Sequence, residues 1–363
     1  MGQCSSTYYF LFVLIMLKII IENKNLRRNL DKSSFYAQRL KKNNLFLFVM
    51  LITLISFSCC SSVKDINTPP RGYRNNTFLK VAYFLGMVDL INMEPEIPSE
   101  LIEYKDIEYR NIDGKALKLD IYRPKVMPRP APVLIFIHGG SWKSGKKEDY
   151  KCYTLDFAKR GYVTASISYR LLPHSNFPDA VEDVKCAVRW IRAHAATDHI
   201  DPQKIAVIGG SAGGHLAMMV GYSSDIPDFD VCIEDSTSSC VQAVVNLYGP
   251  VDLTTDYTKG HSIIIDFIGK SYEENPVGYE QASPIKYISN DDPPTLIFHG
   301  TIDDLVPVSQ ADSLKKILDK ADVANEYYRL KGWPHAMDVA QPVNNYCKNK
   351  MMNFFNRYIP LPK

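Results

Sequence analysis

The chain has 363 residues, of which 46% are hydrophobic and 23% are charged, a globular composition that suits one large α/β domain. Eight of its 42 basic residues and two of its 40 acidic residues lie in residues 1–59, so the remainder carries 34 against 38, a net charge of −4. A slightly acidic body of this kind excludes a basic surface for nucleic acid.

Residues 1–59 have the features of an export region. An apolar run over residues 45–57 follows a basic stretch and precedes small residues, which is the arrangement of an export signal. A cysteine at the end of such a run resembles the signal of a bacterial lipoprotein, and we expect the lipid on Cys59, which follows a serine, or on Cys60. Phe57 departs from the pattern, because a small residue is usual there. An uncleaved anchor helix and plain secretion are the alternatives.

A second apolar run, residues 8–21, is interrupted by Lys18 and is shorter than the ~20 apolar residues that cross a bilayer. A start codon placed too far upstream explains residues 1–36 most simply. We therefore expect an exported protein. As a lipoprotein or a helix-anchored protein, it would touch the membrane only through this N-terminal region. Otherwise it would be a periplasmic or extracellular protein.

The next segment, residues 60–102, is polar and contains Pro69-Pro70 and Asn75-Asn76, which indicates a linker and a loosely held lead-in. Strands and helices then alternate over residues 103–360, which we expect to form the catalytic domain. The expected strands cover residues 106–112, 116–122, 133–137, 162–169, 205–208, 243–248, 295–298 and 326–330. The expected helices cover residues 150–159, 178–195, 308–321 and 347–358, with a further helix-compatible stretch at 215–220.

This alternation predicts the fold class. Asp113-Gly114 joins the first two strands as a hairpin turn, and most later strands are continuous apolar runs typical of buried strands. We therefore expect an α/β fold with a mostly parallel sheet of about eight strands and helices on both faces. Residues 222–242 and 254–285 interrupt the alternation, and we expect them to form a rim or small cap over any site.

The cysteines predict no metal site, because there is no CxxC pair and no His/Cys cluster with zinc spacing. Cys152 and Cys186 fall on expected helices and are interpreted as packed thiols. Cys232 and Cys240 flank a loop, and in an exported protein a disulfide between them is an open possibility.

Residues 204–215 end a strand in glycines before a helix, which fits either a phosphate-binding loop or a nucleophile turn. A dinucleotide loop needs G-x-G-x-x-G and a P-loop needs Gly-Lys-Ser/Thr, and the sequence here provides neither. Residues 209–213, Gly-Gly-Ser-Ala-Gly, match G-x-S-x-G, in which a serine nucleophile occupies a tight strand-to-helix turn. Ser211 is therefore the candidate nucleophile.

A second motif, Ile-Phe-Ile-His-Gly-Gly-Ser-Trp at residues 135–142, closes the strand before the first long helix. It resembles the oxyanion-hole motif of esterases of the α/β-hydrolase fold, in which small residues let backbone N–H groups approach a carbonyl oxygen. The expected donors are the amides of Gly140, Ser141 and Ala212. We interpret His138 as a structural histidine.

Two later motifs supply an acid and a base. Residues 299–307, His-Gly-Thr-Ile-Asp-Asp-Leu-Val-Pro, follow a late strand and place Asp303 as the acid, with Asp304 as its competitor and a helix-capping aspartate as the alternative. His335 follows the last strand, where a general base is expected. The order Ser211, Asp303, His335 is the one that the α/β-hydrolase fold uses. The remaining histidines near these motifs are weaker candidates: His174, His215 and His261.

Taken together, residues 103–360 resemble α/β-hydrolase serine esterases. The stretches at residues 138–142, 168–171, 177–180 and 210–215 are similar to a group that includes carbohydrate acetyl esterases and feruloyl esterase-like (BD-FAE-like) domains. They are also similar to the hormone-sensitive-lipase group, but Ser141 stands where that group has a third glycine and Gly210 where it has an acidic residue. Both departures favour the first group.

The resemblance implies a serine carboxylic-ester hydrolase that works through an acyl-enzyme and needs no metal or organic cofactor. Its expected substrate is an acetylated or feruloylated glycan, and Trp142, Tyr169 and Trp333 offer a possible sugar-stacking face, with ordinary core or rim packing as the alternative. A small-molecule carboxylesterase or lipase-like enzyme is the second hypothesis. A non-catalytic binding protein on the same fold is the third.

Overall fold

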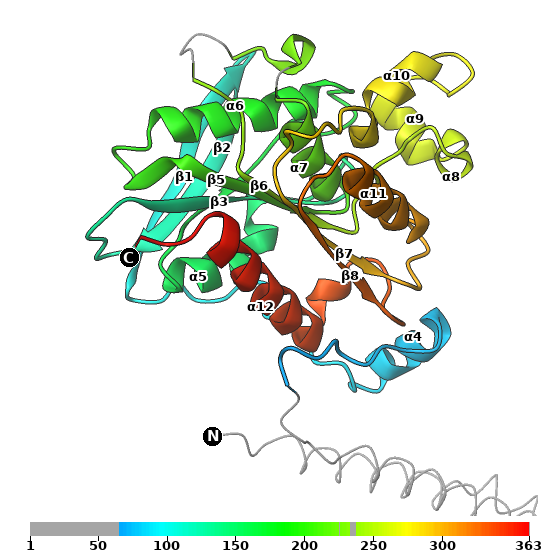
Figure 1. Cartoon of the computed structure of the whole chain (residues 1–363), viewed down its shortest axis with the longest axis horizontal. Helices are drawn as coiled ribbons and strands as arrows, with labels where there is room; N and C mark the ends of the chain where they lie inside the picture. The colour runs from blue at the N-terminus through cyan, green and yellow to red at the C-terminus, as the bar shows by residue number, and fades with distance from the viewer. Residues whose placement is uncertain (1–64, 225, 233–236, 363) are drawn as a thin grey trace, which may run out of the picture. The chain divides into compact units, whose positions relative to one another are not determined.

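Most of the described chain folds into a central sheet and the helices that flank it (Figure 1). The computed structural model describes residues 65–224, 226–232 and 237–362. The export region predicted in residues 1–59 lies outside the described residues. Among those residues, no helix combines the length and apolar character needed to cross a bilayer.

Eight strands form one sheet in the order β1-β2-β4-β3-β5-β6-β7-β8. They are β1 (Leu101–Ile112), β2 (Lys115–Pro124), β3 (Ala131–Ile137), β4 (Val163–Ile167), β5 (Ile200–Gly210), β6 (Ala243–Leu247), β7 (Thr295–Gly300) and β8 (Asn325–Leu330). The β1–β2 hairpin and the β2–β4 pair are antiparallel, and the other five pairs are parallel. The predicted α/β fold with a mostly parallel eight-stranded sheet is confirmed.

Helices cover both faces of this sheet because its central strands are apolar on both sides. In β3, Val133, Ile135 and Ile137 pack on one face, and Leu134 and Phe136 pack on the other. The first face is covered by α6 (Asp179–Ala193), α7 (Ala212–Tyr222) and α11 (Ser309–Lys320). The second is covered by α5 (Lys151–Lys159) and α12 (Gln341–Tyr358) (Figure 1).

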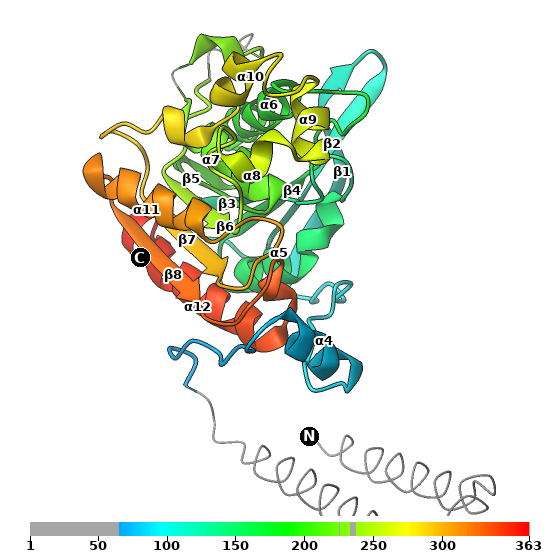
Figure 2. The ribbon, with the colours of Figure 1, turned by 90° about the vertical axis from the view of Figure 1, so that its right-hand side faces the viewer.

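The interruption predicted at residues 254–285 holds three short helices beside the ends of the strands (Figure 2). They are α8 (Asp256–Lys259), α9 (Ser262–Ile268) and α10 (Pro276–Gln281). His215 on α7 ties this small cap to the domain, since its Nε2 lies 2.7 Å from the carbonyl oxygen of Ala282. The ring is fully buried and packs edge-on to Trp142 and Phe267.

The lead-in is more firmly held than its polar composition suggested. It forms α4 (Asn76–Phe84), whose Leu79 and Ala82 join the core that α12 completes. Trp333 donates its indole N–H to the carbonyl oxygen of Pro70 at 2.9 Å, and Leu90 forms a β-bridge with Ala340. Residues 65–100 are therefore part of the folded domain, and not only a linker.

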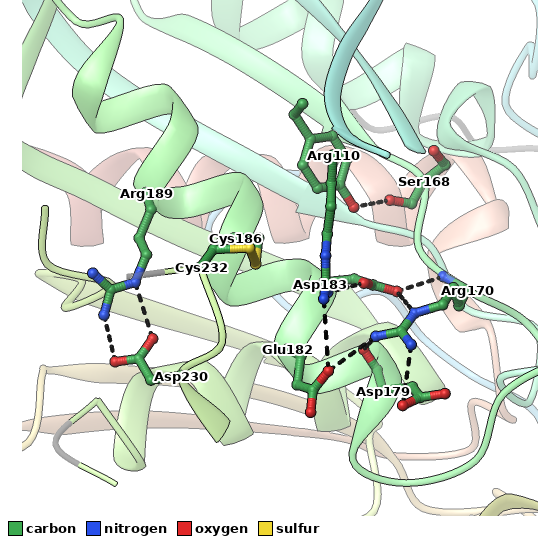
Figure 3. The surroundings of a disulfide bond; sticks show 11 residues. Arg110, Ser168, Arg170, Asp179, Glu182, Asp183, Cys186, Arg189, Asp230 and Cys232 are labelled. Atoms are coloured by element: carbon green, nitrogen blue, oxygen red, sulfur yellow. Dashed lines mark hydrogen bonds and ion pairs between the residues drawn. A yellow bond between two sulfur atoms is a disulfide. The ribbon is translucent and has the colours of Figure 1, made fainter. Parts of the chain in front are cut away.

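The disulfide differs from the pairing that the sequence left open. Cys186 on α6 is bonded to Cys232, whereas Cys240 is a free, exposed thiol (Figure 3). The ion pair of Arg189 with Asp230 binds the same loop to the next turn of α6. The interpretation of Cys186 as a packed thiol is wrong, and of the possibilities left open for Cys232 the structure shows a bond to α6 and not to Cys240.

The same helix begins in a buried ion-pair network, which Figure 3 also shows. The fully buried carboxylate of Asp183 accepts hydrogen bonds from Arg110 and Arg170, and Arg170 also pairs with Asp179 and Glu182. Arg170 and Asp179 belong to two of the stretches that carry the family resemblance. Their role here is structural, because Arg170 binds the segment after β4 to the start of α6, while Arg110 of β1 binds the same carboxylate of Asp183.

Replacing Cys232 by serine is expected to lower the free energy of unfolding by about 2–4 kcal/mol, because the bond closes a loop between residues 46 positions apart. Urea unfolding of the oxidised protein measures this loss. Cys240→Ser is the matched control and should leave stability unchanged. An equal loss in both variants would favour a Cys232–Cys240 bond.

The stability of the protein is expected to fall from pH 6.5 towards pH 4 because of His215. Burial lowers the pKa of this imidazole from 6.5 to about 4, although the hydrogen bond to Ala282 opposes the shift. Between these values the unfolded chain binds a proton that the folded protein does not bind, so acid favours unfolding, by roughly 3 kcal/mol at pH 4. His215→Asn, which keeps a donor for Ala282, should show a flatter dependence of the urea midpoint on pH. Parallel curves would contradict this assignment.

Candidate active site

Ser211 occupies a sharp turn between the last residue of β5 and the first residue of α7. Its backbone angles, φ 55° and ψ −123°, are uncommon for a residue with a side chain and cost about 1–3 kcal/mol. The turn is tight enough that a Cβ on Gly209 would lie 2.2 Å from the carbonyl of Gly213, and a Cβ on Gly213 would lie 2.0 Å from the carbonyl oxygen of Ile137. Glycine is therefore required where α7 meets β3 and β5.

The structure brings the three predicted residues together. His335 Nε2 lies 2.9 Å from Ser211 Oγ, and His335 Nδ1 lies 2.8 Å from Asp303 Oδ2. Asp303 follows β7 and His335 follows β8, so both reach the serine from the edge at which the parallel strands end. These contacts form the relay in which a carboxylate orients an imidazole and the imidazole accepts a proton from a hydroxyl.

The carboxylate of Asp303 is buried and multiply bonded. Its Oδ1 accepts backbone N–H bonds from Leu305 at 3.0 Å and Val306 at 2.9 Å, and its Oδ2 lies 3.2 Å from His299 Nε2. Burial acts to raise its pKa, but the hydrogen bonds from His299 and His335 outweigh burial and lower the pKa to about 2. Asp303 is therefore ionised at neutral pH.

The competing acid, Asp304, points away from this relay. It is exposed, and its Oδ2 accepts a hydrogen bond from Asn76 Nδ2 at 3.0 Å. Of these two neighbouring carboxylates, that of Asp303 therefore lies within the site and that of Asp304 lies beside the lead-in.

Gly140, Ser141 and Ala212, the three residues expected to supply oxyanion-binding amides, lie beside the hollows that open at Ser211. Ser141 and Ala212 line one hollow beside Ser211, and Gly140 and Ser141 line another. Within the described part of the chain, none of the three amides donates a hydrogen bond to another backbone group. Three N–H groups are therefore available to an oxygen that carries developing negative charge.

His138 is structural, as its sequence context suggested. Its ring is buried, stacks on Tyr169 at a centroid distance of 4.4 Å, and has Nδ1 2.8 Å from the carbonyl oxygen of Gly139. Burial lowers its pKa. A neutral imidazole that packs in this way supports the loop that carries Gly140 and Ser141.

A support for His335 was missed at the sequence level. The ring of Tyr248 lies edge-on to the imidazole at 4.8 Å, and its hydroxyl donates to Asp338 Oδ1 at 2.5 Å. Tyr153 donates to Asp338 Oδ2 at 2.9 Å. Burial raises the pKa of Asp338, while these two hydrogen bonds oppose the change. The only sequence signal was an aspartate three residues after His335, because Tyr153 and Tyr248 lie on distant segments.

Two hollows meet at Ser211, Ser141 and His335. The first, of about 450 Å³ including space open to solvent, has an apolar wall that includes Pro250, Ile263, Ile264 and Val306. The second, of about 1160 Å³ including space open to solvent, has a more polar lining. The polar residues of this lining include Asp149, Tyr150, Tyr248 and Asp338. Ile91 and Met93 of the lead-in also belong to it.

The predicted sugar-stacking aromatics are largely buried. Tyr169 stacks on His138 and Trp333 packs against Tyr73, and neither lines the two hollows. Trp142 lines the smaller hollow with only its edge, since its ring stacks on Phe267 at 4.1 Å. Packing inside the domain removes the faces of all three rings from solvent, which corrects the prediction of a stacking platform. In the described residues, no group of histidine, cysteine and acidic side chains is arranged to hold a metal ion.

Curated relatives of this chain are named as esterases. Esterase LipC of Mycobacterium tuberculosis is 35% identical over 235 residues, which make up 62% of this chain and 58% of LipC. Esterase LipQ of the same organism is 34% identical over 269 residues, or 70% of this chain and 63% of LipQ. The chain thus spans roughly three fifths of the length of each relative.

Solved structures of similar fold are also esterases by title. A truncated carbohydrate esterase from gut microbiota superimposes with a TM-score of 0.60 and 28% identity, covering 70% of this chain and 95% of that one. A thermophilic esterase of Thermogutta terrifontis with propionate bound gives a TM-score of 0.63 and 28% identity, covering 75% and 100%. The BD-FAE family model matches residues 119–318, more than half of the chain. The chain therefore belongs to the BD-FAE family, and it has the α/β-hydrolase fold that its sequence resembles.

Proposed function

We propose that the protein is a serine esterase that hydrolyses carboxylic esters through an acyl-enzyme. The observation that carries this proposal is the unbroken relay from Ser211 through His335 to Asp303, with bonds of 2.9 and 2.8 Å. Three free amides beside the same serine supply the second requirement of ester cleavage. The esterase names of the relatives support the same activity.

In the first half of the reaction, Ser211 Oγ bonds to the ester carbonyl carbon as its proton passes to His335 Nε2. The carbonyl oxygen becomes an oxyanion held by the amides of Gly140, Ser141 and Ala212. The bond from carbon to the alcohol oxygen then breaks, and the alcohol leaves with the proton from His335. A water molecule repeats these steps on the acyl-enzyme and releases the acid. Asp303 stays ionised and stabilises the charged imidazole.

The two hollows favour an ester with its acyl group on one side of Ser211 and a polar alcohol on the other. The smaller, apolar hollow suits the acyl group, and the larger one is lined by Ser144 and Asp149, whose side chains can bind sugar hydroxyls. A glycan ester, acetylated or feruloylated, is therefore the proposed substrate, and the carbohydrate esterase among the structural neighbours supports this choice. A small-molecule carboxylesterase is the second candidate, favoured by the limited volume of the apolar hollow.

We also propose that the protein is exported and held at a membrane through its N-terminal region, by a lipid on Cys59 or Cys60 or by the apolar run at residues 45–57. The disulfide supports export, because such bonds persist in oxidising compartments.

The relay predicts opposite outcomes for two neighbouring aspartates. Asp303→Asn is expected to lower kcat for p-nitrophenyl acetate by roughly 10⁴, because the carboxylate that orients His335 is lost. Asp304→Asn, which changes a carboxylate outside the relay, should stay within a few-fold of wild type. Steady-state kinetics on both variants measures the difference, and a reversed order would exchange the two roles.

The nucleophile is tested by Ser211→Ala, which should lose roughly 10⁴–10⁶ of the turnover of p-nitrophenyl acetate and all labelling by a fluorophosphonate, with folding intact by circular dichroism. Equal turnover in wild type and variant would refute the assignment, and no turnover in either would favour a binding protein. Acetate release from acetylated xylan and ferulate release from methyl ferulate then distinguish a glycan esterase from a small-molecule carboxylesterase.

A further inference from the structure

The lead-in exposes an unusual concentration of apolar side chains. Of the twelve large hydrophobic residues that are exposed in the described part of the chain, seven fall between residues 78 and 93. We call these seven the α4 patch: Phe78, Val81, Phe84, Leu85, Met87, Leu90 and Met93. Phe84, at the end of the helix, is 90% exposed. Apolar side chains concentrated and exposed in this way mark an interaction site.

Helix α4 carries a second apolar stripe beside its buried face. Leu79 and Ala82 point into the core, whereas Phe78, Val81 and Leu85, spaced three and four residues apart, form a stripe that faces solvent. Thr77 and Lys80 occupy the remaining side, so the helix is a surface helix with an additional apolar stripe that no other described element covers. Figures 1 and 2 both place α4 at the edge of the domain, beyond the end of α12, where the domain itself covers only one side.

The charges on α4 and on the residues just before it favour an anionic partner. Residues 66–88 contain three cations, Arg71, Arg74 and Lys80, all exposed, and no acidic residue. Acidic residues flank this stretch, Asp65 on one side and Asp89, Glu94 and Glu96 on the other, so the basic charge is confined to α4 and its start. Exposed apolar side chains interspersed with basic ones match the boundary between the headgroups and acyl chains of an anionic bilayer.

The length of the chain before the patch also favours a membrane. Pro70 is fixed to the domain by its hydrogen bond with Trp333. Ten residues lie between Cys59 and Pro70, so the Cα atoms of these two residues are at most roughly 35–40 Å apart at full extension. If residues 45–59 hold the protein at a bilayer as proposed above, this short tether keeps the α4 patch within reach of the lipid surface.

We propose that the α4 patch docks on an anionic lipid bilayer, as a second membrane contact beside the N-terminal anchor. The contact has a consequence for the active site, which rests on the proposed esterase function. Ile91 and Met93 line the larger hollow together with Ser211 and His335. Docking therefore brings the mouth of that hollow to the membrane surface, where esters on membrane-bound glycans or lipids would reach it.

The test uses the full chain reconstituted in vesicles, with a tryptophan added at the patch. Phe84→Trp replaces the most exposed residue of the patch, and Val277→Trp, on α10 at the far end of the domain in Figures 1 and 2, is the matched control at a 60% exposed position. The three native tryptophans give a constant background that the wild type measures. Lipids brominated on their acyl chains quench a tryptophan only on contact.

In vesicles that contain phosphatidylglycerol, the emission added by Phe84→Trp is expected to be quenched, and that of Val277→Trp is expected to be unchanged. Replacing Arg71, Arg74 and Lys80 by glutamine should weaken the quenching, as should vesicles of phosphatidylcholine alone. Equal emission with and without bromine at position 84 would overturn the proposal. If the tethered protein then sediments as a dimer, the patch binds a second copy of the chain instead.

The test is independent of catalysis, since quenching reports contact and not turnover. Phe84→Trp lies outside the relay, so its turnover of p-nitrophenyl acetate in detergent should equal that of wild type. Absent turnover with full quenching would refute the esterase function and leave the docking surface. Normal turnover without quenching would refute the docking surface alone.

Discussion

The close approach of α7 to β3 and β5 is the constraint on which the site depends. A side chain at Gly209 or Gly213 would collide with backbone, so only glycine lets the helix begin directly beneath the strands. That geometry holds Ser211 in a strained conformation and leaves the neighbouring Ala212 amide without a backbone acceptor. The surrounding β-strands, buried on both faces, supply the rigidity that maintains this strain.

The site also requires side chains from distant segments to meet at the hydroxyl of Ser211. Ser211, Asp303 and His335 follow β5, β7 and β8, and parallel strands end at a common edge, so the sheet itself performs the assembly. Two buried carboxylates near His335 then have pKa values shifted in opposite directions, because their surroundings differ. Asp303 receives backbone and imidazole donors and stays ionised, whereas burial raises the pKa of Asp338, which anchors two tyrosines beside His335.

Features that short stretches of sequence determine could be predicted from the sequence. The eight strands, the G-x-S-x-G turn and the motifs around Asp303 and His335 each depend on residues close together in the chain. Features that depend on pairing between distant segments could not be predicted. The Cys186–Cys232 bond needs the path of a loop, and the Tyr153–Asp338–Tyr248 cluster joins α5, the end of β6 and the residues before α12. The burial of Tyr169 and Trp333 likewise follows from tertiary packing.

The lead-in has a consequence for how this protein is divided into parts. The region that matches the family begins at residue 119, yet Ile91 and Met93 form part of the wall beside Ser211. A boundary drawn from sequence similarity would therefore cut through the substrate-binding surface. Under the proposed function, the segment before the family match thus helps to form the surface that receives the alcohol of the ester. Grafting only residues 119–318 onto another scaffold would then transfer part of the site without this wall.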